Sequence, residues 1–125
     1  MNNIIEAKRY LENARQILKE KANKEDGYYQ DKKYVKLAGH AAYSGVLVAL
    51  DGLLGDKKKG RKSVEWYQKE LAGLDKKVSS TFSSVYDILH LSLSYDGSTD
   101  VELAQLGLKR ADQIIDWVQT RLHKN

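Results

Sequence analysis

Apolar residues recur every three or four positions along several long stretches of the chain. The first stripe consists of Ile4, Ala7, Leu11, Ala14, Leu18 and Ala22. The last consists of Ala104, Leu108, Ala111, Ile115, Val118 and Leu122. Residues at this spacing share one face of an α-helix, so each stripe predicts an amphipathic helix. Alternation with a period of two is not sustained over the length of a strand, so the pattern predicts no β-sheet.

The stretch from Asp31 to Leu54 is the most apolar part of the sequence, and it carries two stripes. The bulky stripe consists of Tyr43, Leu47, Leu50 and Leu54, and the small one of Ala38, Ala42, Gly45 and Ala49. A helix that is apolar on more than one face packs against several neighbours. Small residues let a neighbouring backbone approach closely. Such packing explains why the helix contains a glycine, although glycine destabilises a helix by about 1 kcal/mol relative to alanine. We therefore predict that this helix is the central one.

Two further helices are predicted between residues 63 and 95. A short helix begins after Ser63 and carries Val64, Tyr67 and Leu71 on one face. A long helix follows over about 75–95. The predicted N-terminal caps of the long helices are Asn3 with Glu6, Asp31, and Thr99 with Glu102. Short connections favour antiparallel neighbours. The predicted fold is thus all-α: one domain, residues 1–125, forming an antiparallel four-helix bundle with an extra short helix between the second and third long helices.

The composition excludes several classes of protein. Apolar residues make up 42% of the chain and charged residues 30%, as in ordinary globular proteins. The chain has no cysteine, which excludes disulfide scaffolds, zinc ribbons, iron–sulfur sites and thiol nucleophiles. No run of about 18 apolar residues occurs, and Met1 is not followed by a basic region and an apolar run. We therefore expect a cytoplasmic protein that spans no membrane.

Positive charge is concentrated in the first half of the chain. Residues 1–62 hold 14 Lys and Arg against 8 Asp and Glu, whereas residues 63–125 hold 7 against 9. The two basic clusters are Lys32, Lys33 and Lys36, and then Lys57, Lys58, Lys59, Arg61 and Lys62. Such clusters can contact nucleic-acid phosphates, but we favour a solvated surface that keeps the protein soluble. On a helix of 1.5 Å per residue, the two clusters would lie about 35 Å apart, at opposite ends.

Three tyrosines, Tyr28, Tyr29 and Tyr34, lie in the sequence close to the first basic cluster. Aromatic rings among lysines can stack on bases while the amines contact phosphates. Tyrosine is also common at the rim of a helical bundle, where it covers the open end. We favour the second interpretation, in which the tyrosines cover the end of the bundle.

Four polar residues are candidates for a pocket: His40, Tyr43, Asp87 and His90. Asp87 and His90 lie one helical turn apart, a spacing that suits a metal site. A di-iron bundle, however, needs Glu-x-x-His pairs, and this chain has none. Gly-x-Ser-x-Gly and the phosphate-binding loop motif are also absent. We therefore predict no catalytic residue, no metal ligand and no cofactor.

Three stretches of the sequence resemble a known family. They are AKRYLENA at 7–14, GYYQDKKYVK at 27–36, and ILHLS at 88–92 with YDG at 95–97. They resemble a family of small bacterial helical proteins, a domain of unknown function found mostly in Bacteroidetes. The resemblance covers nearly the whole chain. It implies a helical bundle and carries no activity with it.

The order of helices and the small-residue stripe are also similar to the HEPN superfamily of helical bundles. That superfamily includes ribonucleases and partners of nucleotidyltransferases. Its ribonucleases carry an arginine followed, after four to six residues, by a histidine. The corresponding place here, from His90 to Tyr95, contains no arginine, and Ser94 or Tyr95 stands where the histidine would be. This similarity therefore implies binding or assembly without ribonuclease activity.

Two functions follow from these observations. The first is a non-enzymatic interaction module that forms a homodimer or binds a protein partner. It rests on four apolar residues that fall off the main stripes, Trp66, Leu91, Ile114 and Trp117, because exposed apolar patches mark interfaces. The alternative is a HEPN-like protein that binds RNA or a nucleotide through the two basic clusters, as a partner of a nucleotidyltransferase.

Overall fold

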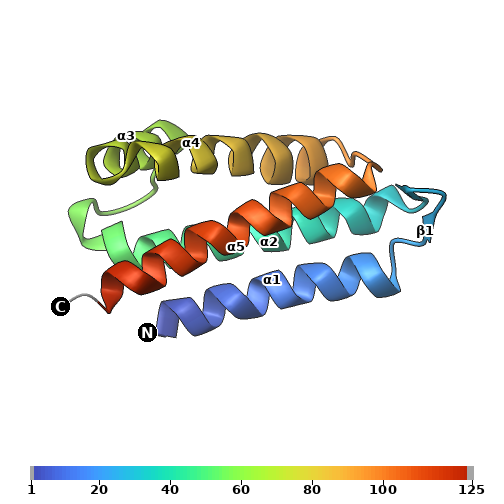
Figure 1. Cartoon of the computed structure of the whole chain (residues 1–125), viewed down its shortest axis with the longest axis horizontal. Coiled ribbons are helices and arrows are strands. Elements are labelled where there is room, and N and C mark those ends of the chain that lie inside the picture. The colour runs from blue at the N-terminus through green and yellow to red at the C-terminus, as the bar shows by residue number, and fades with distance from the viewer. Residues whose placement is uncertain (1, 124–125) are drawn as a thin grey trace.

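The computed structural model describes residues 2–123, which form helices and one small hairpin (Figure 1). The long helices are α1 (Asn2–Glu20), α2 (Lys32–Leu54) and α5 (Val101–Leu122). The remaining long rod consists of α4 (Lys76–Val85) and a π-helix (Tyr86–Tyr95). A 3₁₀ turn (Gly55–Lys57) and the short α3 (Val64–Leu74) connect α2 to this rod. This order confirms the all-α prediction, including the extra short helix between the second and third long ones.

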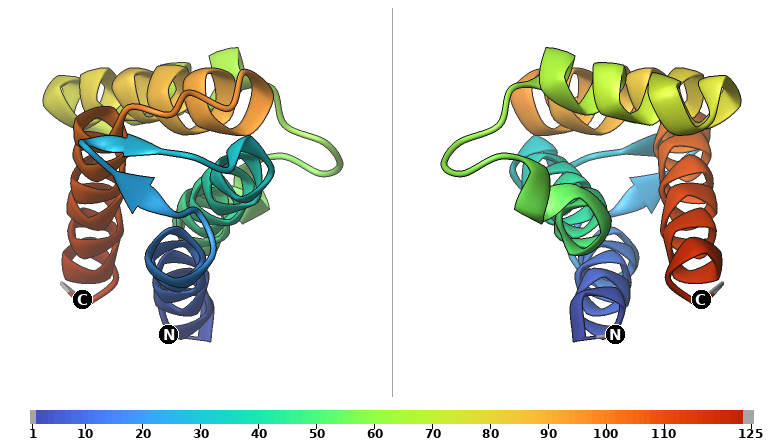
Figure 2. Two further views of the ribbon diagram at one scale, coloured as in Figure 1. Left: turned by 90° about the vertical axis from the view of Figure 1, so that its right-hand side faces the viewer. Right: turned by 90° about the vertical axis from the view of Figure 1, so that its left-hand side faces the viewer.

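The helices are arranged in two groups, which the end views of Figure 2 separate. A layer made of α3, α4 and the π-helix lies across one side of the group formed by α1, α2 and α5. Helix α2 contacts α1, the π-helix and α5, and its small stripe of Ala38, Ala42, Gly45 and Ala49 is buried. The prediction that residues 31–54 form the central helix is therefore confirmed.

Helix α2 is also long and apolar enough to cross a membrane when judged by length and composition alone. Half of its most apolar window is buried inside the bundle. Core helices share this pattern, because their apolar faces pack against neighbouring helices instead of lipid.

Two glycines of α2 lie where other backbones come very close. A Cβ atom on Gly45 would lie 2.9 Å from the carbonyl oxygen of Ala7 in α1. A Cβ atom on Gly39 would lie 2.7 Å from the backbone nitrogen of Ser94 in the π-helix. Gly45 belongs to the small stripe that predicted a close approach. Gly39 lies outside that stripe, so the closeness of α2 to the π-helix was not predicted.

A two-stranded hairpin connects α1 to α2. Strand β1 (Lys24–Glu25) pairs antiparallel with β2 (Tyr28–Tyr29). Asp26 and Gly27 form the turn with φ angles of 53° and 81°, and positive φ at both positions is typical of the Asp-Gly hairpin turn. The expectation that the chain has no strand is wrong here, because two-residue strands are too short to produce alternation.

The hairpin is joined to the start of α5. The backbone N–H of Tyr29 donates to the carbonyl of Thr99 at 2.9 Å, and Tyr28 forms a bridge with Asp100. Asp100 is the N-cap of α5, and its carboxylate accepts from the N–H of Leu103. The predicted cap, Thr99, is therefore wrong by one residue.

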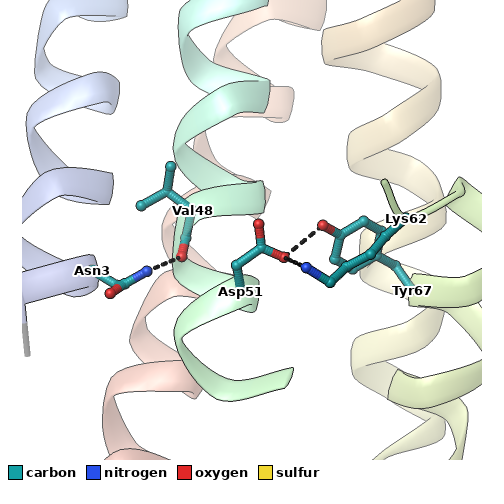
Figure 3. A network of polar contacts seen from close by, with 5 residues as sticks. All are labelled: Asn3, Val48, Asp51, Lys62 and Tyr67. Atoms are coloured by element: carbon teal, nitrogen blue, oxygen red, sulfur yellow. Dashed lines mark hydrogen bonds and ion pairs between the residues drawn. The ribbon is translucent and has the colours of Figure 1, made fainter. Parts of the chain in front are cut away.

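The other helix ends follow local capping chemistry. Asp31 and Ser63 cap α2 and α3, as predicted. Asp75 ends α3 and also caps α4, accepting from the N–H groups of Lys77 and Val78. Asn3 does not cap α1, because it lies inside the helix; its side-chain amide donates to the carbonyl of Val48 in α2 at 3.0 Å (Figure 3). That hydrogen bond attaches the beginning of α1 to the central helix.

Candidate ligand-binding groove on α2

A cavity of about 450 Å³ lies between α2, α3, the π-helix and the loop that precedes α3. Three of the four predicted pocket groups line it: His40, Tyr43 and His90. Asp87 does not line it; its side chain is exposed. Asp87 follows Tyr86, which does line the cavity, and consecutive helical residues point in different directions. The cavity is further lined by Ser44, Leu47, Asp51, Gly60, Arg61, Lys62, Val64, Tyr67 and Tyr86.

One wall of the cavity is a cluster of aromatic rings. The rings of Tyr43 and His90 are 5.0 Å apart between centroids, and those of Tyr86 and His90 are 5.2 Å apart and stacked. Tyr43 and Tyr86 meet edge to face at 6.0 Å. Tyr86 and His90 both come from the π-helix, four residues apart, and π-helical segments are frequent at functional sites. The π-winding thus contributes two neighbouring rings to one cavity wall.

Another part of the cavity wall carries charge. Lys62 Nζ lies 3.5 Å from Asp51 Oδ1, and the hydroxyl of Tyr67 donates to the same oxygen at 2.6 Å (Figure 3). The side chain of Lys62 is 13% exposed and that of Asp51 is 38% exposed, so the ion pair is sheltered on the lysine side only. Arg61 is exposed and lines the cavity beside Lys62. Two cations and one carboxylate leave this wall with a net positive charge.

Two tyrosine hydroxyls of the cavity keep their protons. Burial raises the pKa of Tyr43, and the nearby Tyr86 adds to the rise. Burial also raises the pKa of Tyr67, with further contributions from the hydrogen bond and the charge of Asp51. A protonated hydroxyl can donate a hydrogen bond, so Tyr43 supplies a neutral donor to the cavity.

A second, more open depression of about 620 Å³ continues the cavity along α2. It is lined by Leu37, His40 and the whole first basic cluster, Lys32, Lys33 and Lys36. His40 lines both depressions, so they meet at this side chain. We call the combined surface the α2 groove. From Lys36 to Asp51 it follows α2 for about 22 Å, at 1.5 Å per residue.

The loop before α3 brings part of the second basic cluster back onto α2. Arg61 and Lys62 line the groove, whereas Lys57 pairs with Glu70 of α3 at 3.5 Å. Lys58 and Lys59 are exposed and do not line the groove. Lys62 pairs with Asp51, which lies about 22 Å along α2 from Lys36, so the two clusters lie toward opposite ends of α2. Their separation of about 35 Å stays a prediction.

Sequence reasoning missed several residues of the groove. Tyr86 could have been found from its spacing, because a ring four residues before His90 lies on the same helical face. Asp51 and Tyr67 come from α2 and α3, and no local pattern relates them. Within residues 2–55 and 57–123, no three His, Asp or Glu side chains gather closely enough to hold a metal ion.

The apolar residues that suggested an interaction surface are mostly packed inside the molecule. Ile114 is buried at 1% exposure. Trp66 and Trp117 pack against the core, with Lys62 and Arg121 over their rings at 5.9 and 4.9 Å. Ile114 therefore cannot belong to an exposed apolar face, and both tryptophans are partly covered. Other large apolar side chains are more exposed: Ile5, Tyr28, Leu37, Leu74, Tyr95 and Leu106.

Comparisons with known proteins agree with the sequence resemblance. Residues 2–120 match a family model described as a domain of unknown function (DUF5618). A solved structure, a protein of unknown function from Dyadobacter fermentans, is similar with a TM-score of 0.90 and 57% sequence identity. The similarity covers 97% of this chain and 96% of that one. No curated protein matches the chain. The predicted resemblance to a domain of unknown function is confirmed, and the similarity to the HEPN superfamily stays a prediction.

Proposed function

This chain belongs to the family described as a domain of unknown function (DUF5618), and we propose that it is a non-enzymatic module that binds single-stranded RNA. The observation that carries the proposal is the α2 groove. In it, both basic clusters contribute to one surface, with an aromatic wall between them.

The groove combines the two kinds of contact that single-stranded nucleic acids need. Lys32, Lys33 and Lys36 at one end, with Arg61 and Lys62 at the other, are suited to contact backbone phosphates. Between them, the half-buried rings of Tyr86 and His90 are available for stacking on bases, which contributes about 1–3 kcal/mol per base in such proteins. A duplex, by contrast, keeps its bases stacked on one another and has no use for an aromatic wall.

The absence of catalysis is part of the proposal. His40 and His90 are the candidates for a general base, but among residues 2–123 neither has a carboxylate partner that would orient its ring. The ring of His90 is stacked against Tyr86 and lies close to Tyr43. These contacts support a role for His90 in stacking.

The test measures the binding of a fluorescently labelled single-stranded RNA at two salt concentrations, with fluorescence anisotropy as the readout. We expect affinity to fall with salt, and Arg61→Ala to reduce the logarithmic salt slope by about 0.7, the value for one phosphate contact to a single strand. Arg9→Ala is the matched control, because Arg9 is exposed on α1 and lines neither depression of the groove. Tyr86→Leu should weaken binding without changing the slope.

Three results would overturn the proposal. They are no binding at low salt, affinity that does not depend on salt, and an equal loss of affinity in Arg9→Ala and Arg61→Ala. Cleavage of the RNA by the purified protein would overturn the non-enzymatic part alone.

Self-association is a second proposal, and it rests on the exposed apolar side chains. Leu37 is 48% exposed and Tyr95 is 73% exposed, so both side chains are open to contact with a second copy of the chain. Light scattering across micromolar to millimolar concentrations tests it. A dimer would support self-association, and a strict monomer over the whole range would contradict it.

A further inference from the structure

A second groove, with a different chemistry, lies between α4 and α5. These two helices are neighbours in the bundle (Figure 1). The groove has a volume of about 420 Å³ and is lined by Lys77, Ser80, Thr81, Ser84, Leu106, Lys109, Arg110 and Gln113. Ser84 and Tyr86 are two residues apart, which corresponds to about 200° around a helix. The α4–α5 groove and the α2 groove are therefore on opposite sides of this rod.

The charge of the α4–α5 groove is entirely positive. Lys77, Lys109 and Arg110 line it, and no carboxylate does. The ion pairs found among residues 2–123 involve other cations. Arg110 donates through Nη1 to the hydroxyl oxygen of Ser84, which holds the guanidinium inside the groove. Three positive charges thus face the same space without a neutralising carboxylate in its walls.

The serine hydroxyls of α4 are divided between two faces. Ser79 and Ser83 face α3: Ser79 Oγ donates to the carbonyl of Gln68 at 2.9 Å, and Ser83 Oγ accepts from the Gln68 amide at 2.9 Å. Ser80 and Ser84 face α5. These two make no hydrogen bond to α3 in the described part of the chain. Serine is a weak helix former, so Ser80 and Ser84 weaken α4 without holding it to α3.

The hydroxyls on the α5 side can donate to a ligand. Ser84 Oγ accepts from Arg110, so its own proton is available for another acceptor. Ser80 is exposed in the groove and has no hydrogen-bond partner within residues 2–123. Lysine and arginine are donors without any acceptor atom. A groove that presents several donors and a positive charge matches a compact oxyanion whose oxygens can each accept more than one hydrogen bond.

We propose that the α4–α5 groove binds a phosphate group, either as free inorganic phosphate or as the phosphomonoester of a small metabolite. Arg110 and Lys77 supply the charge, and Ser80 and Ser84 supply neutral donors. The proposal is independent of RNA binding, because it uses none of the residues of the α2 groove.

Nuclear magnetic resonance locates the site. Labelled protein is titrated with sodium phosphate, and in a parallel arm with glycerol phosphate as a phosphomonoester. Sodium chloride at matched ionic strength is the reference for screening. We expect amide shifts confined to about residues 77–84 and 106–113, saturating in at least one arm. The tighter arm distinguishes free phosphate from a phosphomonoester. Shifts confined to the α2 groove, or no saturable shift in either arm, would overturn the proposal.

Variants then separate binding from folding. Lys77→Ala and Arg110→Ala should each weaken phosphate binding about tenfold. Lys76→Ala is the matched control, because Lys76 is the preceding exposed residue of α4 and does not line the groove. Ser80→Ala should weaken binding several-fold while the melting temperature stays equal or rises, since alanine is the better helix former. The proposal would be contradicted if Lys76→Ala and Lys77→Ala lost phosphate affinity equally, or if phosphate binding were unchanged in both Arg110→Ala and Ser80→Ala.

Discussion

Replacing Gly39 by alanine tests whether α2 and the π-helix are packed as closely as their backbones indicate. The added Cβ atom would lie 2.7 Å from the Cβ of Leu93, 2.7 Å from the backbone nitrogen of Ser94 and 2.8 Å from the carbonyl oxygen of Leu89. Two of these three atoms belong to the backbone and cannot rotate away. To reach 3.4 Å, where ordinary contact begins, the two helices must separate by about 0.7 Å.

The expected free-energy change is the difference between two effects. Alanine in place of glycine inside a helix stabilises by about 1 kcal/mol. Overpacking a filled interior costs about 1–3 kcal/mol, and a contact between backbones belongs at the upper end of this range. Gly39→Ala should therefore lower the free energy of unfolding by about 2 kcal/mol. For a chain of this size we expect the melting temperature to fall by roughly 8 °C.

Gly73 provides the matched control in the same fold. It lies in α3, and a Cβ atom built on it has no neighbour within 4 Å. Gly73→Ala should therefore show the helix-propensity gain alone, about 0.5–1 kcal/mol near a helix end, with a higher melting temperature. Thermal and urea denaturation followed by circular dichroism measure both variants. If Gly39→Ala is as stable as wild type, or if the two variants change stability in the same direction, the packing argument is refuted.

Three further predictions concern polar groups. Asn3→Ala should cost about 1 kcal/mol in urea denaturation, because the part-buried hydrogen bond from the Asn3 amide to the carbonyl of Val48 is lost. Because the pKa of Tyr67 is raised, the stability that its protonated hydroxyl contributes is fully present below about pH 10, the pKa of an unfolded tyrosine, and is lost as the pH rises above that value. Tyr67→Phe should therefore make the loss of stability with rising pH shallower in alkaline melting curves, and an unchanged curve would contradict this prediction. Asp51→Asn keeps an acceptor for the Tyr67 hydroxyl but removes the negative charge that pairs with Lys62. RNA should therefore bind a few-fold more tightly at low salt, and weaker binding would count against the α2 groove as the RNA site.

The helices could be predicted from the sequence because their information is local. The stripes from Ile4 to Ala22 and from Ala104 to Leu122 depend on one helix facing one core, and the caps Asp31 and Ser63 depend on a side chain reaching its own backbone. Thr99 failed as a cap because its carbonyl is used by Tyr29 of the hairpin, which is a long-range contact.

The α2 groove could be predicted only in part, for the same reason. His40 and Tyr43 share a face of one helix, but His90 joins them through the close approach of the π-helix at Gly39. Arg61 and Lys62 reach the groove through a loop whose direction no periodicity encodes. Asp87 was included because it lies one helical turn before His90, an argument that assumes α-helical winding where the chain forms a π-helix.

The π-helix has a consequence for how the sequence can vary in length. Its hydrogen bonds span five residues where an α-helix spans four, so each turn accommodates one additional residue. Losing one residue between Tyr86 and Tyr95 would remove the additional residue of one turn, so that this turn could wind as an ordinary α-helix while Asp75 and Asp100 keep their capping positions. Relatives whose lengths differ by one residue should thus carry the gap here, with the flanking helices unchanged in length.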